Sequence, residues 1–454
     1  ICTAFQICPR PAYLINSTIF VAMDEIDHLV NLIDLHMADF GKGIRKWTVS
    51  NSSLGGRGIF AKCDINIGEV IFNEKPILIG PILRQKNLNT CIICYRSLDG
   101  FKCACKNGCS LPMCNSCSES NEHSKICQLF RSWEPVEPQS VRKQTVSLLP
   151  IANGLFLKKF QKELIYNLQS NNSPKSKLEI ASIARNFKKF PSEPETLDYF
   201  VRILSVLNTV AFEALYEDGK YELSMRGLYP LAGMMNHCCT PNTCHPFERD
   251  NIMVLKAAKF IPKGSEITTT YTKILWSNIS RGLFLNITKE FTCNCARCRD
   301  PTENGTYLSA LLCRDRTCAG IALPIDTRLD SPWHCLTCHQ VYASQEMFKI
   351  QDFTLKAINS KVNSGSLKNA IAFVNEKVPT FCPPNSQYVV EAKLEIIFKM
   401  TKSPEVFTET DYRDKIRYCH DLLEILEKLD AGECMIKQLL LEEVRNSKAF
   451  IGIE

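Results

Sequence analysis

Cysteine spacing constrains this chain more than any other feature of its sequence. The 454 residues include 24 cysteines, and most of them fall into four groups, Cys91–Cys127, Cys238–Cys239, Cys293–Cys298 and Cys313–Cys338. C-x-x-C and C-x-C spacings with a nearby histidine are the ligand pattern of Zn²⁺. A disulfide scaffold is the alternative, but such scaffolds are short and lack the 45% hydrophobic residues of this chain. The spacing therefore favours metal sites and a reducing compartment.

The first cysteine group offers four ligand pairs, which is enough for two tetrahedral sites. A cross-braced arrangement gives one ion Cys91, Cys94, Cys114 and Cys117, and the other Cys105, Cys109, His123 and Cys127. Sequence order does not prove this pairing, and Cys103 could replace Cys105. Because so small a segment has almost no apolar core, metal binding would supply its folding free energy. The fourth group, with Cys313, Cys318, Cys335 and Cys338, is typical of a zinc ribbon.

Strand-like and helix-like segments alternate along the chain. Short β-branched runs broken by Gly, Asn and Pro predict strands over 47–81 and again over 223–271. Apolar residues at three- and four-residue spacing predict helices over 158–170 and 197–217, and over 367–378, 389–400, 415–429 and 436–446. The fold class we expect is a multidomain α+β protein.

Three separated motifs carry the chemistry. Gly56-Arg57-Gly58 places two glycines where the backbone can approach a ligand closely, although a plain turn explains the same residues. Asn236, His237 and Asn242 crowd polar groups into an apolar stretch, and buried polar groups need partners. Residues 264–271 (GSEITTTY) then precede Phe291-Thr-Cys-Asn-Cys-Ala-Arg-Cys298. Each motif alone is weak evidence, but their order is informative.

These motifs, in this order and spacing, resemble those of SET-domain methyltransferases. The two-ion Cys/His module inserted after the first motif resembles the MYND finger of the SET-and-MYND (SMYD) family. Within that family, the sequence most resembles the arthropod SmydA branch. The resemblance lies in the residue patterns of 266–272, 291–306 and the last cysteine group. The resemblance covers residues 47–340. It implies a β-rich SET domain split by a MYND zinc finger and a helical insert, post-SET zinc segments and a C-terminal α-helical domain.

The resemblance also implies roles for individual residues. Asn236 and His237 would hold the adenosine part of S-adenosylmethionine, Gly56, Arg57 and Gly58 would lie against its polar end, and Phe291 would pack on its adenine. Tyr271 would be the catalytic tyrosine. Cys239, Cys293, Cys295 and Cys298 would share a zinc ion, making about four structural ions in all. The function implied is S-adenosylmethionine-dependent protein-lysine N-methylation of a histone tail or another protein.

Among the departures from the family pattern, Lys289 bears most directly on the substrate. Lys289 stands where SMYD proteins commonly have an aromatic residue that walls the lysine channel, so a cation there would disfavour a basic substrate. The alternative function is therefore a catalytically weak SET-MYND scaffold, whose finger recruits transcriptional co-repressor partners. A nucleic-acid partner is not expected, because the net charge is only +6 and no basic stripe accompanies the cysteines.

The segments expected from the sequence have the following boundaries. They are a leader (1–22), an N-terminal SET part (23–90), the finger (91–127), a helical insertion (128–222), the core SET domain (223–285), a post-SET zinc segment with a ribbon (286–340) and a helical domain (341–454). The leader is expected to be non-native or disordered, with Met23 as the true start. A signal-peptide remnant is the alternative for its short apolar run. No segment approaches transmembrane length, and we expect a protein of the cytoplasm, the nucleus or both.

Overall fold

The computed structural model describes residues 13–40, 44–82, 90–98, 105, 107, 109, 111–136, 141–171, 174–217, 222–364, 366–403 and 405–452. The chain forms two compact units that alternate along the sequence. The first contains the residues up to Phe60 together with Phe72–Met235 and Phe247–Val254. The second contains Ala61–Ile71, Asn236–Pro246 and the residues from Leu255 onward.

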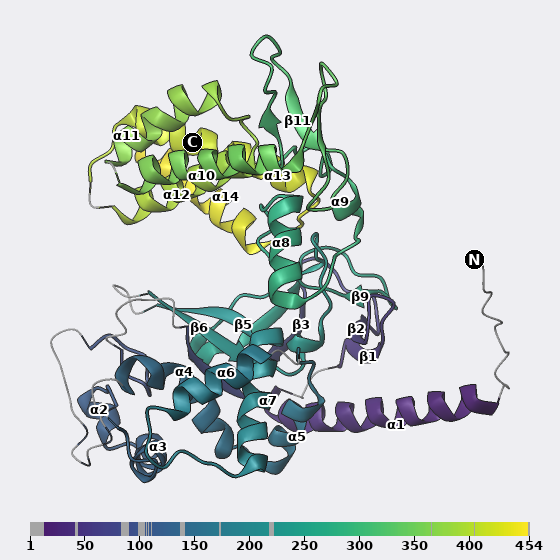
Figure 1. Cartoon of the computed structure of the whole chain (residues 1–454), viewed down its shortest axis with the longest axis vertical. Helices are drawn as coiled ribbons and strands as arrows, with labels where there is room; N and C mark the ends of the chain where they lie inside the picture. Colours follow the sequence, from purple (N-terminus) through teal and green to yellow (C-terminus); the bar gives the residue numbers. More distant parts are fainter. Residues whose placement is uncertain are drawn as a thin grey trace, which may run out of the picture. The chain divides into compact units, whose positions relative to one another are not determined.

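The first unit contains all or most of the following elements (Figure 1). They are α1 (Tyr13–His36), η1 (Ala38–Phe40), β1 (Trp47–Asn51), β2 (Arg57–Ala61), β3 (Val70–Glu74), β4 (Leu78–Pro81), α2 (Asn115–Ser118), α3 (Asn121–Ser132), α4 (Val141–Leu155), α5 (Lys159–Asn167), α6 (Pro174–Ala184), α7 (Pro194–Val210), β5 (Phe212–Glu217), β6 (Glu222–Leu228), η2 (Ala232–Met234) and η3 (Arg249–Asn251).

An antiparallel sheet of order β4-β6-β5 organises this unit, and α4 and α7 pack against it (Figure 1). The prediction of a helix over 197–217 is wrong after Val210. Residues 212–217 pair with β6 from Phe212↔Gly227 to Glu217↔Glu222. Phe212, Ala214 and Tyr216 are apolar at every second position, so this segment can form a strand once β6 lies beside it.

Aromatic side chains join the end of the finger segment to the helical insertion. Phe130 and Trp133, at the end of α3, pack on Phe187 with ring centroids 5.8 and 5.6 Å apart. Trp133 also contacts Phe190 and Phe200, at 5.1 and 6.2 Å. Because aromatic pairs contribute beyond the area that they bury, this cluster fixes α3 against its neighbours.

Glu74, at the end of β3, is fully buried and holds the start of η2. Its two carboxylate oxygens accept hydrogen bonds from the N–H groups of Leu231 and Ala232, at 2.7 and 2.8 Å. His36 Nε2 lies 3.2 Å from the same carboxylate. This contact fixes the chain just before Asn236.

We expect Glu74→Gln to lower the free energy of unfolding by about 2 kcal/mol, because an amide nitrogen would face a backbone donor and the charge-assisted bonds would be lost. Urea denaturation measures this change. Glu213→Gln, on the exposed side of β5, is the matched control, and an equal loss in both variants would contradict the role given to Glu74.

The second unit contains all or most of the remaining elements. They are β7 (Thr243–Cys244), β8 (Met253–Ala257), β9 (Glu266–Ile267), α8 (Asn278–Lys289), α9 (Ala296–Arg299), β10 (Leu311–Leu312), β11 (Ile321–Pro324), β12 (Trp333–Cys335), β13 (Val341–Tyr342), α10 (Ser344–Ser364), α11 (Leu367–Ala372), the π-helical turn η4 (Phe373–Lys377), η5 (Val378–Thr380), α12 (Gln387–Lys402), α13 (Glu409–Lys428) and α14 (Met435–Phe450).

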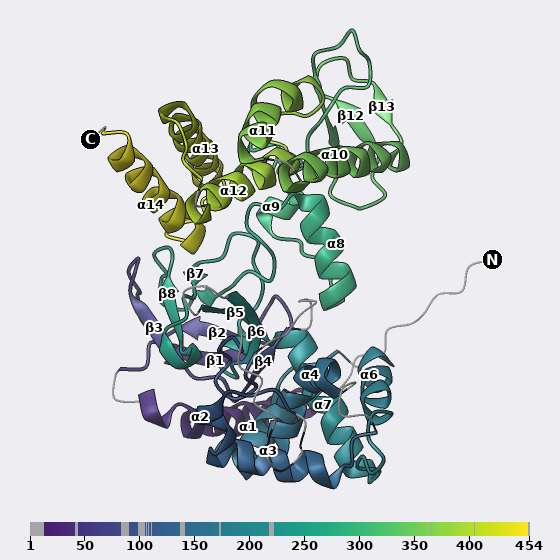
Figure 2. The same ribbon diagram turned by 90° about the vertical axis from the view of Figure 1, so that its left-hand side faces the viewer.

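The C-terminal helices pack side by side around an apolar core (Figures 1 and 2). Val390, Ile396, Leu422 and Leu440 are fully buried in it, and Leu275, from the segment that precedes α8, joins the same core. The predicted helices over 389–400, 415–429 and 436–446 are confirmed by α12, α13 and α14. The predicted helix over 367–378 continues beyond α11 as a π-helical and then a 3₁₀ turn.

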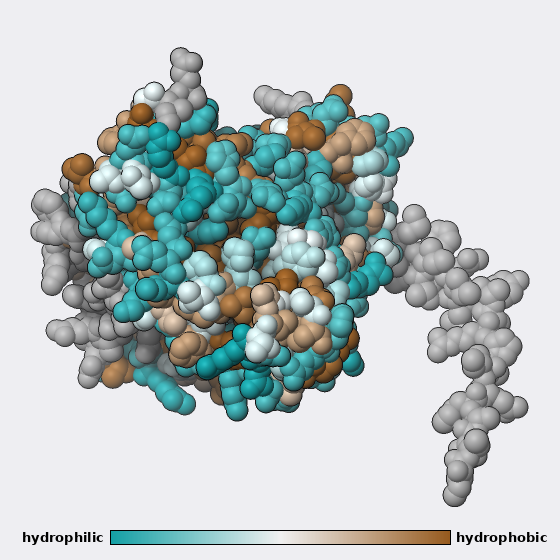
Figure 3. Space-filling model, turned by 90° about the horizontal axis from the view of Figure 1, so that it is seen from above, coloured by the Kyte–Doolittle hydropathy of each residue, from teal (hydrophilic) through white to brown (hydrophobic). Residues whose placement is uncertain are grey.

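Mixed helix and strand content is confirmed, with β1 to β4 inside 47–81, most of β6 inside 223–271 and β7 to β9 entirely within that range. The finer domain boundaries stay a prediction. Residues 13–22 of the expected leader belong to α1, and residues 1–12 lie outside the described part. None of the described helices is long and apolar enough to cross a membrane. On the face shown in Figure 3, hydrophobic residues occur in small groups among hydrophilic ones.

Candidate active site and metal centres

The sixteen predicted metal ligands come together in four sets, and the ligand atoms of each set lie within 4.8 Å of one another. Every cysteine in the described residues is a free thiol. Four sulfur atoms around Zn²⁺ at ≈ 2.3 Å stand about 3.8 Å apart in a tetrahedron, and the closest sulfur pairs here are separated by 3.3 to 3.9 Å. The geometry therefore fits zinc at all four sets.

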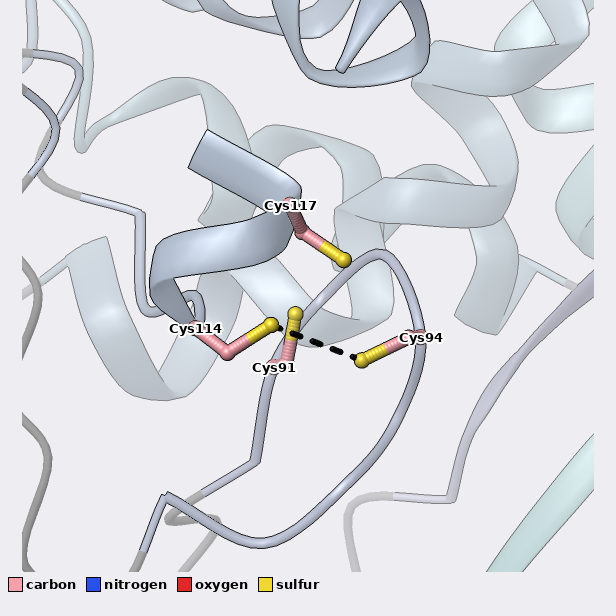
Figure 4. Close-up of side chains that lie close together, drawn as sticks. All are labelled: Cys91, Cys94, Cys114 and Cys117. Carbon is pink, nitrogen blue, oxygen red and sulfur yellow. Dashed lines mark hydrogen bonds between the residues drawn. The ribbon is translucent and has the colours of Figure 1, made fainter. Parts of the chain in front are cut away.

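The finger holds two of these sets in the cross-braced order. Cys91, Cys94, Cys114 and Cys117 point toward one another from a loop and from α2 (Figure 4). The second set consists of Cys105, Cys109, His123 and Cys127, and all four are buried. Cys103, the possible substitute, lies outside the described residues.

His123 is oriented by a second hydrogen bond. Its Nε2 lies 3.5 Å from Cys109 Sγ, and its Nδ1 lies 2.6 Å from the carbonyl oxygen of Ser118. The carbonyl can only accept, so Nδ1 carries the proton and Nε2 is left for the metal. Ser120 caps α3 by accepting from the N–H of His123, at 3.1 Å.

The four cysteines of the predicted ribbon also come together in the structure. The antiparallel sheet of order β10-β11-β12-β13 presents Cys313, Cys318, Cys335 and Cys338 together. Backbone N–H groups of Gly320 and Thr337 donate to the sulfur atoms of Cys318 and Cys335, both at 3.4 Å. Such donors stabilise thiolates, which is the form that binds metal.

The predicted catalytic residue, Tyr271, lies beside two predicted cofactor-binding residues. Its ring centroid is 5.2 Å from that of His237 and 6.3 Å from that of Phe291, and His237 and Phe291 are 5.9 Å apart. Burial, followed by the carboxylate of Glu266, raises the pKa of Tyr271 to about 12. The phenol therefore stays protonated and can donate a hydrogen bond at neutral pH.

His237 joins Tyr271 to the third cysteine set. The backbone N–H of Tyr271 donates to His237 Nδ1 at 3.0 Å, so the ring proton belongs on Nε2, which lies 3.2 Å from Cys239 Sγ. Burial, aided by the charges of Arg281 and Arg297, lowers the pKa of His237 to about 4. The imidazole is therefore neutral at physiological pH, and both of its nitrogens serve structural contacts.

The backbone of His237 is the part left for a ligand. His237 and Thr269 form a parallel β-bridge. The N–H of Thr269 donates to the carbonyl of Asn236 at 3.0 Å, and the N–H of Cys238 donates to the carbonyl of Thr269 at 2.9 Å. The N–H and C=O of His237 therefore point away from Thr269, and neither has a partner among the described residues. Thr269 Oγ1 is also buried, and it has no hydrogen-bond partner among the residues that the structure describes.

Asn236 and Asn242 are both tied to the segment that leads to Tyr271. Asn236 Nδ2 donates to Glu266 Oε1 at 2.7 Å. Asn242 Nδ2 donates to the carbonyl of Glu266, and Asn242 Oδ1 accepts from Thr268 N–H, both at 2.8 Å. The Asn242 side chain thus joins its own segment to the backbone of Glu266 and Thr268.

Gly56, Arg57 and Gly58 belong to the first unit. Gly56 has φ +60° at the turn between β1 and β2, where its carbonyl accepts from Ser52 N–H at 2.9 Å. The guanidinium of Arg57 donates to the carbonyl of Asn167. A left-handed turn explains Gly56 locally, and the cofactor contact of these three residues stays a prediction.

Sequence reasoning missed a buried charged group beside the third cysteine set. Arg281, Arg297 and Glu303 are 0%, 1% and 0% exposed. Arg297 lies between two predicted ligands, Cys295 and Cys298, and Glu303 lies just after them. A charged residue within a metal-binding C-x-C-x-x-C motif is the signal that could have found this group.

Comparisons with known proteins agree with the motifs. A model of the SET domain matches residues 56–272. The chain is 43% identical over 426 residues to SET domain-containing protein SmydA-8, isoform A, of Drosophila melanogaster, and the match covers 92% of each protein. The chain thus contains a SET domain. It belongs to the SET-and-MYND (SMYD) family, in the arthropod SmydA branch.

More distant similarities extend to named enzymes. The mouse histone-lysine N-methyltransferase SMYD3 is 24% identical over 293 residues, which are 59% of this chain and 64% of that protein. The Arabidopsis thaliana histone-lysine N-methyltransferase ASHR1 is 24% identical over 417 residues, with 84% and 82% covered. A solved structure of the LSMT SET domain bound to lysine and AdoHcy covers 94% of this chain and 91% of its own, at 14% identity and a TM-score of 0.31.

Proposed function

We propose that this protein is an S-adenosylmethionine-dependent protein-lysine N-methyltransferase. The observation that carries the proposal is the group of Tyr271, His237 and Phe291 beside the third cysteine set, within and just after the segment that matches a SET domain. Relatives named histone-lysine N-methyltransferases support it. We also propose the expected arrangement, in which the finger and a helical insert divide the SET domain, and post-SET zinc segments and a helical domain follow.

The residues of this group suit an adenosine-containing ligand. The unpartnered N–H and C=O of His237 form a donor-acceptor pair that can bind the edge of an adenine, and Phe291 offers a ring to pack on it. The buried hydroxyl of Thr269 is a further polar group in need of a partner. When bound, S-adenosylmethionine supplies an electrophilic methyl group on a sulfonium.

The proposed role of Tyr271 is to align the acceptor amine with the methyl group. Methyl transfer to an amine is an in-line displacement, so orientation and exclusion of water account for most of the catalysis. The protonated phenol of Tyr271 can orient the acceptor amine, and the neutral His237 holds the Tyr271 backbone. The acceptor lysine has to be neutral, although its reference pKa is about 10.4. Burial in a site that also binds a cation favours the neutral amine.

Binding of the methyl donor tests this proposal. We expect the zinc-replete protein to bind S-adenosylmethionine in isothermal titration calorimetry. Phe291→Ala should weaken binding about tenfold, since an aromatic contact contributes about 1.4 kcal/mol. Phe260→Ala, at an exposed position, is the control and should bind as the wild type does. If the wild-type protein binds no S-adenosylmethionine, the proposed methyltransferase activity is refuted. The alternative function, a scaffold that recruits transcriptional co-repressor partners, would then remain.

Lys289 gives the proposed activity a distinctive pH dependence. Its Nζ lies 5.5 Å from the centroid of the Tyr271 ring, and burial lowers its pKa to about 8. Below that pH Lys289 is cationic and repels both the sulfonium and a basic substrate, and above it the repulsion is gone. We therefore expect Lys289→Gln to be more active than the wild type at pH 7, with the ratio falling toward one by pH 9.

Deprotonation of the substrate lysine raises the methylation rates of both proteins as the pH increases. The ratio of the two rates at each pH removes this common effect. Lys263→Gln, at an exposed position, should keep the wild-type profile. A ratio of Lys289→Gln to wild type that stays constant from pH 7 to pH 9 would show that the charge of Lys289 does not govern the activity.

The proposed methyl acceptor is a lysine of a histone or of another protein. The free cysteines in metal-type sets suit a reducing compartment, and we propose that the protein acts in the cytoplasm, the nucleus or both.

A further inference from the structure

The buried charged group of Arg281, Arg297 and Glu303 lies outside the set of Tyr271, His237 and Phe291 to which the proposed reaction is assigned. All three side chains are buried, and Arg281 Nη1 and Arg297 Nη2 lie 2.7 and 2.9 Å from Glu303 Oε2. Two guanidiniums face one carboxylate, so the group carries an excess positive charge away from water. Burying such a charge is costly unless another charge compensates it.

The compensating charge lies in the third cysteine set. Arg281 Nη2 is 3.8 Å from Cys298 Sγ, and Arg297 Nη1 donates to the carbonyl of Cys239 at 3.3 Å. Four thiolates around Zn²⁺ carry two net negative charges, whereas four protonated thiols carry none. The charge balance of this region therefore fits a metal-loaded set of Cys239, Cys293, Cys295 and Cys298.

The same arginines hold the backbone that follows Tyr271. Arg297 Nη1 donates to the carbonyl of Ile274 at 2.7 Å, and its Nη2 donates to the carbonyl of Trp276 at 2.8 Å. Arg281 also donates to the Trp276 carbonyl. Because the guanidinium fork is planar and rigid, the carbonyls of Cys239, Ile274 and Trp276 are fixed relative to one another.

Glu303 is aimed into this group by a tight turn. Asp300 accepts from Thr302 N–H at 2.9 Å and from Asn304 N–H at 2.7 Å. Glu303 and Asn304 have φ values of +53° and +58°, a region that residues other than glycine seldom adopt. The turn thus holds a strained backbone in order to place the Glu303 carboxylate. The second oxygen of this carboxylate, Oε1, accepts from the N–H of Asn278 at the start of α8, at 2.9 Å.

We propose that Arg297, held with Arg281 by Glu303, is a positioning residue that locks the Tyr271–Trp276 segment to the third metal site. Metal at Cys239, Cys293, Cys295 and Cys298 then fixes Tyr271 from two sides. One connection runs through His237 to the Tyr271 backbone N–H, and the other runs through the guanidiniums to the carbonyls of Ile274 and Trp276. The catalytic consequence rests on the proposed function, but the structural connection does not.

Hydrogen exchange of the full-length protein, followed by mass spectrometry, tests the connection without an activity assay. We expect Arg297→Gln and Cys295→Ser each to raise exchange in residues 269–277 at least tenfold. Cys338→Ser, which removes a ligand of the fourth set, and Arg299→Gln, at an exposed position of the same helix α9, should leave that segment unchanged. If Arg297→Gln does not fold, Arg297→Lys, which keeps the charge and loses the fork, takes its place.

Kinetics of the same variants test the consequence. Arg297→Gln should lower kcat at least tenfold while the KM for S-adenosylmethionine stays within threefold, whereas a general loss of folded protein would lower the zinc content and melting temperature as well. Unchanged exchange in residues 269–277 of Arg297→Gln, or an equal increase in Cys338→Ser, would overturn the proposal. If the wild type transfers no methyl group, exchange still decides whether metal and Tyr271 are coupled.

Discussion

Cys109→Ser is expected to unfold the finger. Cys109 is fully buried, and its set is the one in which all four ligands are buried. The finger is too short a segment to be held by apolar packing alone, and structural zinc contributes about 10–16 kcal/mol to the folding of finger peptides. Replacing one thiolate by a hydroxyl removes a strong ligand and leaves the remaining thiols and the imidazole without their metal.

Metal analysis and hydrogen exchange measure this effect. We expect zinc to fall from four ions per chain to three or fewer, with loss of exchange protection over residues 111–133. Protection in α7 should fall as well, because Trp133 packs on Phe200 of that helix. Cys63→Ser, half-buried and outside the four sets, should keep four zinc ions. A Cys109→Ser protein with four zinc ions and wild-type protection would contradict the account of the finger.

Tyr271→Phe is expected to lower kcat by about 10²–10³-fold, the cost of removing one aligned hydrogen-bond donor from an active site. The change deletes only the hydroxyl, so the ring contacts with His237 and Phe291 remain. The Tyr271 backbone N–H still donates to His237. Affinity for S-adenosylmethionine should therefore stay within twofold of the wild type.

Single-turnover methyl transfer separates this loss from weaker binding. Tyr166→Phe deletes a hydroxyl from an exposed tyrosine and should leave kcat unchanged. Equal kcat values for Tyr271→Phe and the wild type would remove Tyr271 from the catalytic role, while a large loss of cofactor affinity would make it a binding residue instead.

The four Cys/His sets could be predicted from the sequence because the pattern of their ligands is local. C-x-x-C and H-x3-C pairs can only place their ligands a few ångströms apart, so few pairings were possible. The sequence left the pairing of the four ligand pairs open, and the structure brings Cys105 and Cys109 together with His123 and Cys127. The order of the motifs around Tyr271 and His237 singled out these two residues, and their rings lie 5.2 Å apart in the structure.

Other features depend on contacts that the sequence does not reveal. Residues 212–217 have the spacing of a continued helix, and only pairing with β6 makes them a strand. Glu74 meets Leu231 across more than 150 residues. Arg297 donates to three backbone carbonyls, those of Cys239, Ile274 and Trp276, and such partners have no signature in a sequence. The role of the His237 ring was likewise hidden, since its partners are the Tyr271 backbone and Cys239.

The central claim is methyl transfer to lysine, and amino-acid analysis of the product tests it most directly. Zinc-replete wild-type protein would be incubated with methyl-labelled S-adenosylmethionine and a mixture of histones and other proteins, and the products hydrolysed to free amino acids. We predict labelled N-methyl-lysine with the wild type and little or none with Tyr271→Phe. No labelled N-methyl-lysine from a wild-type protein that binds S-adenosylmethionine, or equal amounts from both proteins, would contradict the account.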